Sequence, residues 1–121
     1  MNFVKTLSVV ALIVAAGSVS AQSISRERIG EHLAKCVANH LAFGLGSPKD
    51  QAKAEEYAIA AWKLARKYIS EENIRLVGAK QATLTDSMKE ENSKETARSL
   101  VVKSNTLCLT FESQVMSGKF D

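Results

Sequence analysis

Three side chains that could coordinate a metal ion recur at a four-residue spacing early in the chain. His32, Cys36 and His40 stand at i, i+4 and i+8, which places them along one face of an α-helix. Imidazole nitrogens and a thiolate are ligands that zinc prefers. No second cluster with ligand spacing exists in the sequence, and a disulfide would consume Cys36. We therefore expect no metal site, and we expect His40 to be a partly buried, hydrogen-bonded histidine.

His40 and Met88 suggest a second chemistry, because a helix bundle can hold haem between a histidine and a methionine. The two residues are expected near the same end of a bundle, on its first and third helices. The Cys-x-x-Cys-His motif of covalent haem attachment is absent from the sequence, and methionine fills many cores without a cofactor. We expect no cofactor, with a ligand or cofactor carrier as the alternative function.

Motifs of hydrolytic catalysis are also absent. The sequence has no Gly-x-Ser-x-Gly, no His-Glu-x-x-His and no glycine-rich phosphate loop. Its acidic pairs, such as Glu55-Glu56 and Glu71-Glu72, are expected at helix starts or on outer faces, where they meet solvent or the helix dipole. The sequence therefore predicts a protein that is not an enzyme.

The amino terminus has the pattern of a secretory signal peptide. Lys5 supplies a positive charge, residues 6–17 form a mainly apolar run, and Val19 and Ala21 are small residues where a signal peptidase cleaves. We expect residues 1–21 to be removed and residues 22–121 to form one domain in the periplasm or outside the cell. An uncleaved anchor is the alternative, although a spanning helix needs about 20 apolar residues.

Composition and charge favour a small helical domain. Of the 121 residues, 45% are hydrophobic and one is proline, and the abundant Ala, Leu, Glu and Lys favour helix. The formal net charge is +3, and removal of Lys5 would leave +2. So small an excess does not indicate nucleic acid or an anionic membrane as a partner.

Apolar residues at helical spacing predict four helices, at about residues 25–42, from Pro48 to before Ser70, at about 71–90, and from Asn92 or Ser93 to about 116. Gly44 and Gly46 are expected to stop the first helix through a positive φ, and Gly118 the last. The second helix is apolar around most of its circumference, so we expect it to be the most buried. Trp62 and Phe111 are expected in the core.

The short connections favour antiparallel neighbours, so the predicted fold is all-α, a small antiparallel four-helix bundle. Cys36 and Cys108 lie near the midpoints of its first and last helices, which are neighbours in such a bundle. We therefore expect one disulfide between these helices.

Small size, one disulfide and no catalytic constellation favour a small exported, non-catalytic protein-interaction module, such as an inhibitor, an immunity-type protein or a chaperone. Its expected partner is another protein, with no nucleic acid and no stable membrane anchor after cleavage. The Gly44, Leu45 and Gly46 loop is the expected contact, because it holds an apolar side chain between two flexible residues. The alternative is that Leu45 folds back onto the core.

Overall fold

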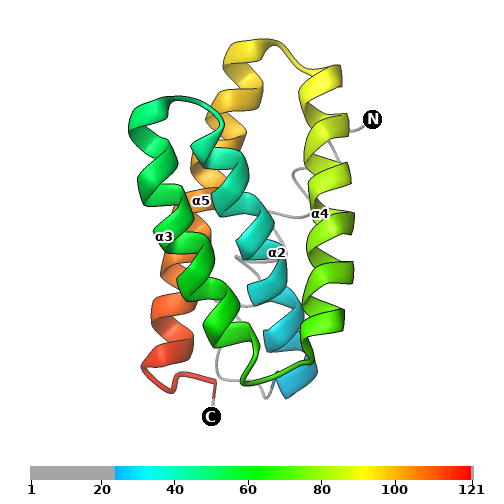
Figure 1. Ribbon diagram of the computed structural model, residues 1–121, viewed down its shortest axis with the longest axis vertical. Coiled ribbons are helices and arrows are strands. Elements are labelled where there is room, and N and C mark those ends of the chain that lie inside the picture. The colour runs from blue at the N-terminus through cyan, green and yellow to red at the C-terminus, as the bar shows by residue number, and fades with distance from the viewer. Residues whose placement is uncertain (1–23, 121) are drawn as a thin grey trace.

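The computed structural model describes residues 24–120, so the expected signal peptide and its cleavage point lie outside the described residues. The described part forms four helices and no strand: α2 Arg26–Gly44, α3 Pro48–Ala65, α4 Glu71–Glu91 and α5 Lys94–Met116 (Figure 1). The predicted all-α class is confirmed, and the helix bounds match the expected ones to within a few residues. None of these helices has a stretch that is long and apolar enough to cross a bilayer.

Each helix begins after a serine whose hydroxyl oxygen accepts a hydrogen bond from a backbone N–H in the first turn. These caps are Ser25, Ser47, Ser70 and Ser93. Such a cap satisfies one of the N–H groups that a helix start leaves without a partner. At the start of α5 the cap is Ser93, whereas Asn92 ends α4 by donating its side-chain N–H to the Met88 carbonyl.

The helices alternate in direction, and α2 lies between the other three (Figure 1). It packs closely against α3, α4 and α5, which make few contacts among themselves. The antiparallel four-helix bundle is therefore confirmed, but the second helix is not the most buried. Nine of the 19 residues of α2 are buried, against five of 18 in α3, because α3 turns mainly its alanine stripe toward α2.

Two glycines of α2 allow close approach, Gly44 by α3 and Gly30 by the connection between α3 and α4. A Cβ on Gly44 would lie 2.6 Å from the Cβ of Ala54, and one on Gly30 would lie 2.6 Å from Cγ2 of Ile69. Gly44 and Gly46 were expected to stop α2 through a positive φ, and this expectation is wrong. Among the described residues, only Gly118 has a positive φ, of 80°, just after the end of α5.

A disulfide joins Cys36 to Cys108, with 5.5 Å between their Cα atoms. It links the middle of α2 to α5, as predicted, and such a bond is typical of proteins in an oxidising environment.

The main core surrounds the disulfide and contains Phe111, which is buried as expected. Trp62 was also expected there, but it is only partly buried and packs against the edge of this core. A second, smaller cluster lies toward the α4–α5 connection and consists of Met88, Ala97, Leu100 and Val101.

Candidate functional site

The most concentrated polar chemistry in the described structure is a buried histidine–glutamate pair between α2 and α5. His40 has no exposed surface, and Glu112 is 5% exposed. His40 Nε2 lies 2.6 Å from Glu112 Oε2, and Nδ1 lies 2.6 Å from Asn105 Oδ1. The Tyr57 ring covers the imidazole, with 5.4 Å between ring centroids.

Both ring nitrogens of His40 therefore face an oxygen. Which nitrogen donates and which accepts depends on where the imidazole carries its hydrogen. A histidine beside a carboxylate could act as a general base, but this one is sealed from solvent and from substrate. His40 is thus a hydrogen-bonded core residue, as expected, although fully rather than partly buried.

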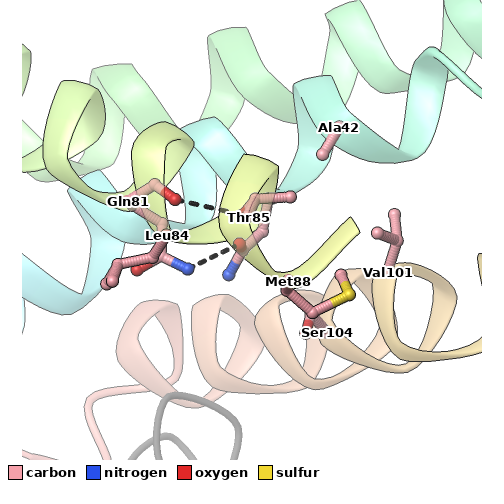
Figure 2. A pocket seen from close by; sticks show the side chains of 8 residues that line it. Ala42, Gln81, Leu84, Thr85, Met88, Val101 and Ser104 are labelled. Atoms are coloured by element: carbon pink, nitrogen blue, oxygen red, sulfur yellow. Dashed lines mark hydrogen bonds between the residues drawn. The ribbon is translucent and has the colours of Figure 1, made fainter. Parts of the chain in front are cut away.

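A second group of hydrogen bonds extends the buried polar layer to α4. Gln81 donates from Nε2 to Asn39 Oδ1 over 3.1 Å, and Asn39 Nδ2 donates to Cys108 Sγ over 3.6 Å. The Thr85 hydroxyl donates to the Gln81 carbonyl (Figure 2). We call the five side chains of the two groups the polar belt: Asn39, His40, Gln81, Asn105 and Glu112.

Sequence reasoning found only His40 of this belt. Gln81 interrupts the apolar residues of the third predicted helix, and a polar residue at a core position is a sign of a buried partner. Glu112 carried a similar sign, because it stands four residues after Cys108 and so shares its helical face.

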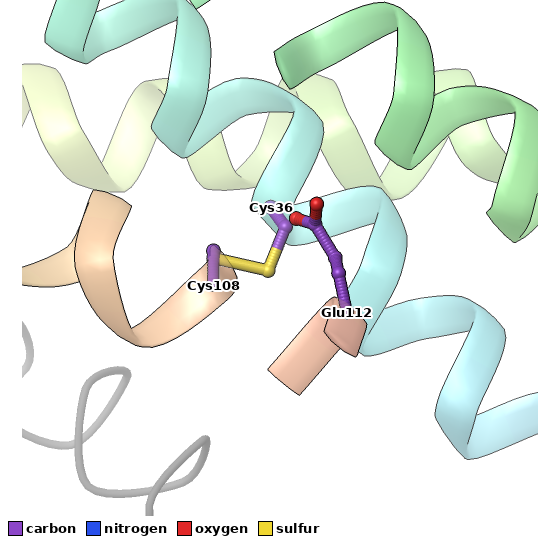
Figure 3. Close-up of side chains that lie close together, drawn as sticks. All are labelled: Cys36, Cys108 and Glu112. Atoms are coloured by element: carbon purple, nitrogen blue, oxygen red, sulfur yellow. A yellow bond between two sulfur atoms is a disulfide. The ribbon is translucent and has the colours of Figure 1, made fainter. Parts of the chain in front are cut away.

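The three residues with metal-ligand spacing do not form a site together. Cys36 is in the disulfide, and both His40 nitrogens are engaged. Among the described residues, the one group with ligand atoms within 4.8 Å of one another is Cys36, Cys108 and Glu112 (Figure 3). Its two sulfurs are bonded to each other, and a disulfide sulfur is not the thiolate that a metal ion binds.

His32 lies one turn before Cys36 and is buried against Phe111 in an edge-on contact, with 5.7 Å between ring centroids. Its Nδ1 has no hydrogen-bond partner among the described residues. Burial lowers the pKa of His32 from its ordinary 6.5 to about 4, and the positive charges of Lys35 and Arg28 contribute. His32 is therefore neutral near pH 7.

The proposed haem pair is also separated. Met88 lines a small internal cavity of about 20 Å³ that His40 does not line (Figure 2). That volume holds roughly one water molecule, whereas ligand sites usually need about 300–1,000 Å³. The His40 nitrogens face Asn105 and Glu112 on α5, so neither is directed at Met88.

An apolar groove is open on the surface between α2 and α4, with Trp62 of α3 at its edge, and encloses about 330 Å³. Leu41 and Leu45 of the α2 end line it and are 48% and 77% exposed. The alternative that Leu45 folds back onto the core is therefore wrong. The Arg75 and Asp86 side chains line the same groove from α4.

A second hollow, of about 600 Å³, lies on the other side of Leu45. Its charged lining residues are all basic: Lys89, Lys94 and Arg98. Arg98 donates to the Phe43 carbonyl over 2.8 Å and to Asp50 Oδ2 over 2.9 Å, so it also holds the α2–α3 connection in place. Leu45 thus separates an apolar hollow from a basic one.

Of the three residues of the expected contact loop, Gly44 is buried in the last turn of α2, and Gly46 lies against Arg98. Leu45 alone presents a large exposed apolar side chain.

No protein-family model matches this chain, and no curated protein and no solved structure shows significant similarity to it.

Proposed function

We propose that this protein is a small exported, non-catalytic module that binds another protein. Two features support export: the signal-peptide pattern of residues 1–21 and a disulfide that needs an oxidising environment to persist. The expected compartment is the periplasm or the cell exterior, with residues 22–121 as the working protein.

The observation that carries the proposed interaction is the position of Leu45. An apolar side chain that is 77% exposed stands between an apolar groove and a hollow with three basic residues. Exposed apolar residues beside hollows are typical of protein interfaces, and surrounding charges select the partner. The partner that fits presents apolar side chains next to acidic ones, as an inhibited enzyme, a toxin or a chaperone client could.

The buried chemistry supports a structural rather than a catalytic role. His40 and Glu112 would be the natural acid–base pair, but the bundle encloses them and the disulfide holds the two helices that carry them. The cavity beside Met88 is too small for a haem or a comparable ligand, so it does not favour the carrier alternative.

The test is capture of partners from the native compartment with the wild-type protein and with Leu45→Asp. We expect the variant to fold normally and to lose the partner, because a carboxylate replaces the apolar contact and repels an acidic surface. Met116→Asp is the matched control, since Met116 is 70% exposed and is the last residue of α5. The end of α5 lies at the opposite end of the bundle from the α2–α3 connection (Figure 1).

A folded Leu45→Asp variant that retains every partner would show that this end of the bundle is not the contact. A wild-type protein that captures nothing and carries a coloured or metal-containing ligand would replace the proposal with the carrier function.

A further inference from the structure

The wall that α4 contributes to the apolar groove is largely uncovered. Only three of the 21 residues of α4 are buried: Ile74, Gln81 and Met88. Beside this buried line, Arg75, Ala79, Ala82 and Asp86 are exposed and line the groove. Their spacings of four, three and four residues place them on one face of the helix.

This face has opposite charges at its two ends and small residues between them. Arg75 and Asp86 are 11 residues apart, which is about three helical turns or roughly 16 Å. Ala79 and Ala82 lie between them, with Gly78 beside them on the groove wall. Small side chains allow two helix backbones to approach closely.

Such a face is complementary to itself when it is turned around. If a second α4 lies antiparallel to the first, a twofold axis midway between Arg75 and Asp86 brings each arginine to the aspartate of the other copy. A twofold interface requires this relation, because the same patch serves both partners. The apolar groove beside the stripe then receives the α4 of the second copy.

We propose that two copies of this chain associate about a twofold axis, each placing α4 in the groove of the other. The contact buries Leu41 and the alanine stripe and forms two ion pairs, each between Arg75 of one copy and Asp86 of the other. Arg75 also lies 4.0 Å from Glu71 within its own helix. This ion pair is long and exposed to solvent, so it holds the guanidinium weakly. The inference goes beyond the proposed function, since it adds a second copy of the chain as a partner. Leu45 lines the same groove but takes no part in the two ion pairs.

A second copy fits this groove better than an unrelated helix, because its own α4 carries an aspartate to face Arg75 and an arginine to face Asp86. The charges are opposite, lie on the same face and belong to the same groove wall. The basic hollow behind Leu45 is bounded by other residues of α4 and by α5, so a dimer leaves it open to a further protein.

The test measures the mass of residues 22–121, with the disulfide formed, by sedimentation equilibrium from micromolar to millimolar concentration. We expect a monomer–dimer equilibrium for the wild type. Arg75→Glu and Asp86→Lys should each weaken it by about tenfold or more, because each reversal places like charges together twice in the dimer. Lys103→Glu, an exposed reversal on α5, is the control and should leave the equilibrium unchanged.

Mixing the two variants is the decisive step. In a mixed dimer of Arg75→Glu with Asp86→Lys, one contact joins the two introduced side chains and the other joins the two native ones. Both contacts then pair opposite charges, so we expect the mixture to dimerise to within about threefold of the wild type. A parallel pairing would also bring opposite charges together in the mixture, but it would place like charges together in the wild type, and neither reversal alone would weaken it. A dimer through a different surface would respond to neither reversal.

Three outcomes would overturn the proposal: a wild type that stays monomeric at millimolar concentration, a dimer that both reversals leave intact, or a mixture that fails to recover. A groove that is found occupied by a different protein would also overturn it. The first three results concern association of the protein with itself and do not bear on capture through Leu45, so the failure of one proposal is distinguishable from the failure of the other. A different protein in the groove would overturn the dimer and support capture there, because Leu45 lines the same groove.

Discussion

At the scale of single residues, the buried polar contact between His40 and Glu112 is the most consequential feature. A buried hydrogen bond contributes little on balance, but removal of one partner leaves the other buried polar atom without compensation. His40 and Glu112 lie on different helices and meet at 2.6 Å, so this pair also fixes the register of α2 against α5.

We predict that Glu112→Ala destabilises the fold by about 1–3 kcal/mol, because the buried Nε2 of His40 loses its hydrogen-bond partner. Urea denaturation at neutral pH measures the loss. Glu56→Ala, at an exposed position of α3, is the matched control and should change stability by less than about 0.5 kcal/mol.

Replacement of both His40 and Glu112 distinguishes the loss of stability caused by an unpaired polar group from the loss caused by poorer packing. The double variant His40→Met with Glu112→Met should be less damaging than Glu112→Ala alone, since it leaves no buried polar atom of the pair without a partner. A loss below about 1 kcal/mol for Glu112→Ala would mean that the contact between His40 and Glu112 contributes little to stability.

His32 provides a second prediction, on pH. Its pKa is about 4 in the folded protein and 6.5 in its ordinary state. As the pH falls, His32 of the unfolded chain therefore binds a proton at a higher pH than His32 of the folded protein. The free energy of unfolding consequently falls as the pH drops from 6.5 toward 4. Between about pH 7.5 and about pH 5, His32 should account for a loss of roughly 2 kcal/mol.

Urea midpoints at the two pH values measure this effect, with His32→Leu as the comparison. The variant should lose less stability on acidification than the wild type, because it has no imidazole to protonate on unfolding. Equal pH dependence of the two proteins would contradict the lowered pKa.

At the scale of helices, the glycines of the bundle play different roles. Gly44 lets α3 approach α2, since a Cβ there would lie 2.6 Å from the Cβ of Ala54. Gly78 in α4 has no such neighbour: its Cβ would lie 3.8 Å from the Ala34 carbonyl oxygen, which is ordinary contact.

We predict opposite effects for the two alanine substitutions. Gly44→Ala should destabilise the fold by about 1–3 kcal/mol through overlap with α3. Gly78→Ala should stabilise it by about 0.5–1 kcal/mol, because alanine favours the helix and meets no obstacle. Thermal unfolding at low protein concentration compares them, and a stabilised Gly44→Ala would show that α3 can shift without cost.

At the scale of the whole molecule, α2 is the central helix, and the other three pack around it (Figure 1). This arrangement explains why a groove exists at all. Because α3 and α4 flank α2 with few contacts to each other, part of α2 near Leu41 is left open between them. The two proposed interactions both use surfaces that this arrangement exposes.

We predict that the exported protein begins at Gln22. Val19 and Ala21 supply the small residues that a signal peptidase requires, and a polar stretch follows them. Intact-mass measurement of protein recovered from outside the cytoplasm checks this, with Ala21→Leu as the variant that should block cleavage. A mass that includes residues 1–21 in the wild type would refute it.

Local patterns in the sequence determined the four helices, their approximate bounds and the antiparallel order. Caps and apolar periodicity act within a few residues, and short connections leave little choice of direction. The Cys36–Cys108 bond followed from the same local information, because midpoints of neighbouring antiparallel helices must meet.

Only the tertiary structure decided that α2 is central, that Trp62 lies at the edge of the core and that Leu45 is exposed. It also brought Gln81 to Asn39 and Glu112 to His40. These results depend on how each helix is rotated about its axis and on how closely its backbone approaches a neighbour. Such features come from contacts between residues distant in sequence, which helical periodicity alone does not encode.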